Sequence, residues 1–231
     1  MDKEQLRVYA EPITSLYYIR TELPKDILEK VNDDIDYIIK NKNTLEKWNY
    51  NLAGNLEEEY ELSTNSSHLI KDFSINLAKS YFQVVEDENL NPTRKLDHPP
   101  NFFEKEVSYE LASLWINLQK KYEFNPIHSH TGDYSFVIWI RIPYDLSEEL
   151  NCKNSKDSVQ PSNSLFEFHF NHASGVMQSL PLYIDKSWEG VMIMFPSWLH
   201  HNVNPFYTSD EYRISISGNI NIKILEDNDN E

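Results

Sequence analysis

The chain has 231 residues, of which 40% are hydrophobic and 13% aromatic, so it can bury a substantial core and is not globally disordered. Its formal net charge of −16 disfavours sequence-independent binding to nucleic acid and to anionic membrane surfaces. Cys152 is the only cysteine, which excludes an intramolecular disulfide and a zinc site built from thiolates.

The N-terminus is charged and lacks the apolar segment of a signal peptide, and no apolar run is long enough to span a membrane. We therefore expect a cytoplasmic protein. Residues 1–105 are predicted to form a helical support, because apolar residues recur there at helical spacing. The two predicted helices carry Leu28, Val31, Ile35 and Ile38, and then Leu69, Phe73, Leu77, Tyr81 and Val84.

From about residue 107 the hydrophobic period changes to two, which is typical of β-strands. The predicted strands are "LWINLQ", "YSFVIWIRI", "SLFEFHF", "PLYID", "GVMIMFP", "NVNPF" and "YRISISGNINI". Short strands punctuated by turn residues favour an antiparallel sandwich or barrel. We expect one domain over 1–231, with the β-rich core at 106–222 and an acidic tail at 223–231. Residues 145–164 are polar and show no strand pattern, which predicts a mobile lid or a disordered loop.

Two histidines stand at strand spacing in "NPIHSHTGDYSFVIWI". Residues i and i+2 of a strand point to the same face, so His128 and His130 are expected to project together. Paired imidazoles suit iron, zinc, copper or nickel. The alternative is that both are ordinary solvent-facing or hydrogen-bonded core histidines. The preceding Asn125 and Pro126 are expected to shape the start of the strand.

A second cluster follows about seventy residues later in "FPSWLHHNVNPF", where a predicted strand delivers His200 and His201. In "EYRISISGNI", Arg213 and Ser215 share a strand face. A guanidinium beside a hydroxyl can clamp a carboxylate. The C-terminal half therefore combines candidate metal ligands with a candidate carboxylate holder.

The order of these motifs resembles the 2-oxoglutarate- and iron(II)-dependent dioxygenases, and most of all a small phage and bacterial branch. The resemblance covers residues 105–222 and is carried by the "HxH" strand and by the block from "FPSWLHHNVNPF" to "RISISGN". It implies a mainly β fold preceded by helices, namely the double-stranded β-helix (jelly roll) shared with the cupins.

Residue by residue, the resemblance assigns His128 and His201 as metal ligands, with His200 facing away. It assigns Arg213, assisted by Ser215, to the distal carboxylate of 2-oxoglutarate. The third metal ligand stays open. The family's usual triad is two histidines and a carboxylate. Strand geometry favours His130, whereas charge balance favours Asp133, which could reach in past a turn.

The implied cofactors are Fe(II) and 2-oxoglutarate, with O2 as the other cosubstrate and hydroxylation of an unactivated C–H bond as the default outcome. The substrate could be a peptidyl proline, a free amino acid, a nucleobase or a small metabolite. Two alternatives remain: a cupin-like isomerase or hydrolase, which would not need Arg213, and a non-enzymatic jelly-roll binding module. The sequence does not decide whether the Ser135 face or the Phe136 face of the strand looks at the metal.

Overall fold

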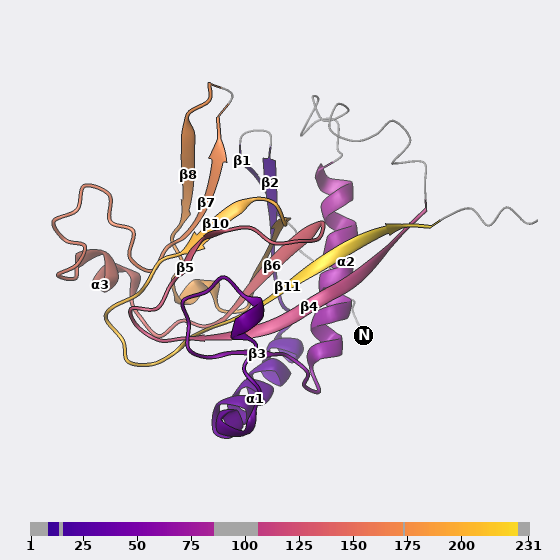
Figure 1. Cartoon of the computed structure of the whole chain (residues 1–231), viewed down its shortest axis with the longest axis horizontal. Helices are drawn as coiled ribbons and strands as arrows, with labels where there is room; N and C mark the ends of the chain where they lie inside the picture. Colours follow the sequence, from indigo (N-terminus) through magenta and orange to yellow (C-terminus); the bar gives the residue numbers. More distant parts are fainter. Residues whose placement is uncertain (1–8, 14–15, 86–105, 173, 226–231) are drawn as a thin grey trace, which may run out of the picture.

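The computed structural model describes residues 9–13, 16–85, 106–172 and 174–225 (Figure 1). The strands are β1 Tyr9–Ile13, β2 Leu16–Glu22, β3 Glu59–Glu61, β4 Val107–Gln119, β5 Asn125–His128, β6 Tyr134–Arg141, β7 Phe166–Asn171, β8 Met177–Leu182, β9 Val191–Pro196, β10 His200–Val203 and β11 Arg213–Ile224. The helices are α1 Lys25–Asn41, α2 Ser67–Val85 and α3 Leu146–Asn151, with short 3-10 turns at Lys42–Thr44, Asn49–Asn51 and Lys186–Trp188.

Two antiparallel sheets form the β-rich core. The larger sheet has the order β1-β2-β9-β6-β11-β4-β3, and the smaller has the order β5-β10-β7-β8. From β4 to β11 the chain crosses repeatedly between the two sheets, with β4, β6, β9 and β11 in the larger and β5, β7, β8 and β10 in the smaller. This interleaving is the double-stranded β-helix, so the predicted jelly roll is confirmed.

The N-terminal part supplies more than helices. Strand β2 pairs with β9, and β3 pairs with β4, so the N-terminal strands extend the larger sheet at both of its edges. The side chains of Tyr18 and Ile19 on β2 are almost fully buried. The prediction of a helical support for this region was therefore incomplete, because it did not include β1 and β2, although the two predicted helices are present.

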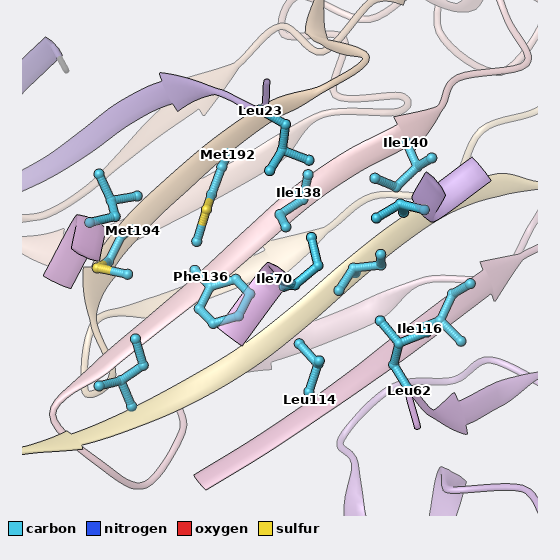
Figure 2. Close-up of a cluster of buried hydrophobic side chains, with 14 of the residues drawn as sticks. Leu23, Leu62, Ile70, Leu114, Ile116, Phe136, Ile138, Ile140, Met192 and Met194 are labelled. Carbon is cyan, nitrogen blue, oxygen red and sulfur yellow. The ribbon is translucent and has the colours of Figure 1, made fainter. Parts of the chain in front are cut away.

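Helices α1 and α2 cover the face of the larger sheet that points away from the smaller one. Val31, Ile35 and Ile38 of α1, at the predicted helical spacing, are buried in the same cluster as Ile70 and Leu77 of α2. Figure 2 shows the strand side of this cluster, where Phe136, Ile138 and Ile140 of β6 lie beside Met192 and Met194 of β9, and where Leu114 and Ile116 of β4 lie on the other side of β11. Burial of this apolar face is the main driving force for docking the helices.

Several strand boundaries differ from the predicted ones. The strand expected at "PLYID" lies earlier, at Met177–Leu182, and Asp185 instead accepts a hydrogen bond from the backbone N–H of Ser187 to cap a 3-10 turn. Strand β8 is at the edge of its sheet, and its first three residues are exposed, so it carries no apolar alternation. Strand β4 is longer than its predicted segment and begins at Val107.

The insertion at 145–164 is not the disordered loop that its polar composition suggested. It contains α3, whose first turn is capped by Asp145. The carboxylate of Glu149 is fully buried and accepts hydrogen bonds from the backbone N–H groups of Tyr207 and Thr208 at 2.7–3.0 Å. The Thr208 hydroxyl adds a further hydrogen bond at 2.6 Å. A buried, fully bonded carboxylate fixes this segment against the loop that precedes β11.

Within the described ranges, none of the helices has the length and apolar character needed to cross a membrane.

Candidate metal and cosubstrate site

Strands β5 and β10 place two histidines opposite each other. His128 is the last residue of β5, His201 is the second residue of β10, and the two are direct partners in the antiparallel register. Their ring centroids lie 4.3 Å apart. Directly opposed residues on neighbouring strands point to the same face, so the sheet itself brings these two imidazoles together.

His130 joins them from just beyond the end of β5. Its backbone N–H donates to the carbonyl of Ser197 at 2.8 Å, which ties it to the turn between β9 and β10. Its ring centroid lies 4.9 Å from that of His128 and 5.2 Å from that of His201. The candidate ligand atoms of the three histidines all lie within 4.8 Å of one another, so a single ion can reach all three.

Backbone hydrogen bonds fix which nitrogen is free on two of the rings. Nδ1 of His128 lies 2.7 Å from the carbonyl of Pro126, and Nδ1 of His201 lies 2.9 Å from the carbonyl of Leu199. A carbonyl can only accept, so Nδ1 carries the proton and donates in both cases. The Nε2 lone pairs are left free for a metal, which is the usual arrangement of a ligating histidine.

The imidazoles are held in their neutral, ligating form. Burial, followed by the neighbouring His128, lowers the pKa of His130 to about 4. Burial also lowers the pKa of His128, and it lowers that of His201 well below its usual range. The His201 ring is buried and stacks on Phe166 at 5.3 Å between centroids, with the edge of Phe195 at 4.9 Å. Aromatic packing therefore fixes the ring and keeps water away from it.

Asp133, the other sequence candidate for the third ligand, lies outside this cluster. Its Oδ2 accepts a hydrogen bond from the backbone N–H of Ile222 at 2.6 Å, and its own N–H donates to the carbonyl of Ile220 at 2.9 Å. Asp133 thus joins the start of β6 to β11 and is exposed. The described residues bring His130, and not Asp133, to the two opposed histidines.

Arg213 begins β11 and is only 3% exposed. Its Nε and one Nη donate to Oε1 of Gln119 at 3.0 and 2.7 Å. The remaining N–H groups donate to the Tyr144 hydroxyl and to the carbonyls of Ser164 and Asn204 at 2.7–3.1 Å. All of these acceptors are neutral, and no ion pair of Arg213 is found among the described residues. A buried positive charge without a counter-charge is costly, so this arrangement favours an incoming anion.

One cavity connects these groups. It is lined by all three histidines, by Arg213 and by Ser215. Ser215 is held by Asn117, whose Nδ2 donates to its Oγ at 3.1 Å. The face of β6 that carries Ser135, Val137 and Trp139 lies on the cavity side, which answers the question left open by the sequence: Val137 and Trp139 pack between the sheets, whereas Phe136 packs under the helices.

Sequence reasoning missed the polar face of β4. Gln119 and Asn117 are direct register partners of Arg213 and Ser215. In "LWINLQ" the alternation places Trp115, Asn117 and Gln119 on one face, and that face could have been matched to Arg213 and Ser215 if the pairing of β4 with β11 had been known.

The other histidines near the smaller sheet lie outside the cluster. His200 is exposed, as expected for a residue that faces away from the cavity. His169 pairs with His200 across β7 and β10, and its Nε2 contacts Oδ1 of Asn202. His172 contacts the hydroxyl of Ser174.

The fold and the site together define a double-stranded β-helix whose cavity holds three converging imidazoles beside a buried guanidinium. Residues 113–219 match a sequence family described as "Putative 2OG-Fe(II) oxygenase". Residues 113–219 therefore form a 2OG-Fe(II) oxygenase domain, and the cofactors of such a dioxygenase domain are Fe(II) and 2-oxoglutarate, with O2 as a further cosubstrate. The three-nitrogen donor set fits iron(II).

Solved structures with a similar chain trace were also found. A prolyl-4-hydroxylase from Pseudomonas putida is 14% identical, with 87% of this chain and 90% of that chain covered and a TM-score of 0.46. AviO1 from Streptomyces viridochromogenes Tue57 is 12% identical, with 87% and 89% covered and a TM-score of 0.47. An oxidoreductase of the 2OG-Fe(II) oxygenase family from Burkholderia pseudomallei is 13% identical, with 93% and 72% covered and a TM-score of 0.37. No curated protein matches the chain.

Proposed function

We propose that the protein hydroxylates an unactivated C–H bond of a small metabolite or a peptidyl residue such as proline, with His128, His130 and His201 as the iron ligands. In this proposal Arg213, assisted by Ser215, binds the distal carboxylate of 2-oxoglutarate. When bound, the iron and its cosubstrates supply the oxidising chemistry that converts C–H to C–OH, and the protein supplies binding, orientation and exclusion of water.

The observation that carries the proposal is the buried, uncompensated charge of Arg213 in the same cavity as the three imidazoles. Gln119 is the one acceptor of Arg213 that also lines this cavity, and its Oε1 receives two guanidinium N–H groups as a carboxylate oxygen would. The distal carboxylate is therefore expected to meet the guanidinium at the Gln119 edge. Exchange of a neutral acceptor for a charged one strengthens the hydrogen bonds.

The remaining residues have supporting roles. The carbonyls of Pro126 and Leu199 hold the Nδ1 protons of His128 and His201, so both Nε2 atoms face one point. Phe166 and Phe195 shield the His201 ring from water. Asn117 holds the Ser215 hydroxyl close to the cosubstrate end of the cavity.

The competing functions make different use of these groups. A cupin-like isomerase or hydrolase would require the imidazoles but not a buried guanidinium beside them. A non-enzymatic binding module would require neither three neutral imidazoles on one point nor the aromatic shield around His201. The presence of three imidazoles and a buried guanidinium in one cavity favours the oxygenase.

A matched pair of arginine variants tests the proposal. Arg213→Lys keeps the charge but loses the planar fork that a carboxylate needs. Arg141→Lys is the control, because Arg141 lies on β6 and pairs with Asp36 of α1 at 2.7 Å, outside the cavity. We expect Arg213→Lys to raise the KM for 2-oxoglutarate at least about tenfold, and Arg141→Lys to leave it unchanged. Succinate release measures both.

Iron binding is the control for an intact metal site, and 2-oxoglutarate turnover separates the oxygenase from the isomerase or hydrolase. Arg213→Lys should still bind stoichiometric Fe(II) under anaerobic conditions, because the three imidazoles are untouched. If Arg213→Lys consumed 2-oxoglutarate with wild-type KM, the assignment of Arg213 would be wrong. If the wild-type protein bound Fe(II) but consumed no 2-oxoglutarate, the isomerase or hydrolase would be favoured.

A further inference from the structure

A second set of polar groups lines the same cavity from the N-terminal part of the chain. Glu59 lies on β3 and is the register partner of Asn117 on β4, so its side chain points to the cavity side of the sheet. A bridge between Asn55 and Phe124 brings the preceding loop to the start of β5. Gly54, Glu59 and Asn125 thereby become neighbours on the cavity wall.

Two acceptor oxygens in this set have no partner. Oε1 of Glu59 and Oδ1 of Asn125 are both buried, and neither has a hydrogen bond within the described part of the chain. Glu59 as a whole is 1% exposed, and its other oxygen, Oε2, accepts from Nδ2 of Asn49 at 3.2 Å. Buried polar atoms are nearly always hydrogen-bonded, so two adjacent unpaired acceptors indicate a missing donor.

Gly54 keeps the space beside these oxygens open. A Cβ at this position would lie 2.7 Å from Oδ1 of Asn125, closer than real side chains allow, and 3.0 Å from Oε1 of Glu59, which is a tight contact. Both oxygens therefore lie against Gly54, and a side chain there would crowd them. A donor atom of a ligand in the cavity would lie farther from Gly54 than a Cβ does, at hydrogen-bond distance from the two acceptors.

The charge around this space favours a cation. The ion pairs of this region join Lys42 and Lys120 to Glu57 and Glu58, and among the described residues none reaches Glu59. Burial, followed by the repulsion of Glu123, raises the pKa of Glu59 to about 7. A positive group beside this carboxyl would remove that penalty and hold it ionised.

We infer that Glu59 and Asn125 form a recognition site for a positively charged amino group of the primary substrate, and that Gly54, which has no side chain, keeps the approach to these oxygens open. The inference rests on the proposed function, because it assigns the polar end of the substrate in the same cavity. It narrows the substrate class to amines: an amino acid, an amino-terminal residue or another small ammonium compound. Asn125 then has a binding role in addition to the structural one that its place before the motif suggested.

Binding of small probes to the metal-free protein tests this site directly. Ethylammonium, acetate and ethanol have similar size and differ in charge and donor capacity. We expect saturable binding of ethylammonium, followed through the fluorescence of Trp115 and the other tryptophans, and much weaker binding of acetate and ethanol. Trp115 lines the same cavity, so its emission should respond.

Three variants and one control sharpen the result. Glu59→Gln keeps the shape but removes the charge, and should weaken ethylammonium binding at least about tenfold. Gly54→Ala fills the space and should weaken binding similarly. Asn125→Asp adds a second carboxylate and should tighten binding. Glu61→Gln is the matched control, because Glu61 lies on the same strand but is exposed, and it should bind like the wild type.

Several results would overturn the inference: no saturable binding of ethylammonium to the wild type, equal binding of acetate, or unchanged affinity in both Glu59→Gln and Gly54→Ala. If one variant fails to fold by circular dichroism, the others decide. A different result would contradict the proposed oxygenase function without contradicting the amine site. In that case ethylammonium would still bind, but Fe(II) and 2-oxoglutarate would produce no charge-transfer absorbance.

Discussion

The two faces of β11 lie in different environments. Ile214, Ile216 and Ile220 are buried against the helix-covered cluster, whereas Arg213 and Ser215 line the cavity between the sheets. Neighbouring residues on one strand thus belong to different environments, because successive side chains of a strand alternate. One face of the larger sheet holds the fold together, and the other carries the chemistry.

The cavity itself is also divided. Its walls from β4 and β11 carry Gln119, Asn117 and Arg213, while its walls from β6, β7 and β9 carry Val137, Trp139, Phe166 and Phe195. A polar wall suits the carboxylates of 2-oxoglutarate, and an apolar wall keeps water from the metal ligands.

The largest effect is expected at the metal. His130→Ala should weaken Fe(II) binding by more than about a hundredfold, because removal of a ligand costs more than removal of its supporting partner. Asp133→Asn should keep Fe(II) binding, since an amide oxygen can still accept from the N–H of Ile222. Anaerobic iron titration measures both variants, and the reverse order of the two affinities would assign the third ligand to Asp133.

Substitutions on the two faces of β11 should differ in their effect on the free energy of unfolding. Ile216→Ala removes a fully buried side chain from the helix-side cluster and should cost about 2–5 kcal/mol of unfolding free energy. Ser215→Ala, its neighbour on the cavity face, should cost less than about 1 kcal/mol and should instead raise the KM for 2-oxoglutarate. Urea denaturation and succinate assays measure these effects. Equal losses of stability would show that the two faces are not divided in this way.

A carboxylate placed on the polar wall should compete with the cosubstrate. Gln119→Glu would form an ion pair with Arg213, because Oε1 of Gln119 already receives two of its N–H groups. We expect the affinity for 2-oxoglutarate to fall about tenfold or more, with Fe(II) affinity nearly unchanged. Unchanged 2-oxoglutarate affinity would mean that the cosubstrate carboxylate does not meet the guanidinium at this edge.

The last prediction concerns the stability contribution of Glu59, which depends on pH and leaves the metal and cosubstrate groups untouched. Its pKa is raised from 4.5 to about 7, so the unfolded chain releases this proton at lower pH than the folded protein. The group therefore loses stabilising effect as pH rises from about 4.5 to about 7. Glu59→Gln cannot ionise, so its stability relative to wild type should increase by about 2–3 kcal/mol between these limits. Thermal unfolding across this pH range measures it, with Glu61→Gln as the control.

The sequence predicted the strands that are buried on at least one face and the helices that cover them. In β6, β9 and β11 the apolar alternation or run is long, and the structure has each strand close to its predicted place. Edge strand β8 was misplaced and the N-terminal strands β1 and β2 were missed, because the positions of strands at or next to a sheet edge depend on the partners with which they pair.

Some residues of the candidate site could be predicted from the sequence, and others could not. His128, His201 and Arg213 follow local motifs and could be selected from the sequence. His130 was selected for strand geometry, yet it lies beyond the end of β5 and is held by Ser197. Gln119 and Glu59 could not be selected as site residues from the sequence. Each lines the cavity because of the strand register, which pairs Gln119 with Arg213 and Glu59 with Asn117, and these partners lie far away in the chain.

Anaerobic titration of the wild-type protein with Fe(II), and then with 2-oxoglutarate, tests the central claim most directly. If three imidazoles hold one ion within reach of Arg213, the protein binds one equivalent of Fe(II), and 2-oxoglutarate then produces a metal-to-ligand charge-transfer absorbance that Arg213→Lys weakens. Substoichiometric iron, or tight iron binding with no absorbance change on addition of 2-oxoglutarate, would contradict it.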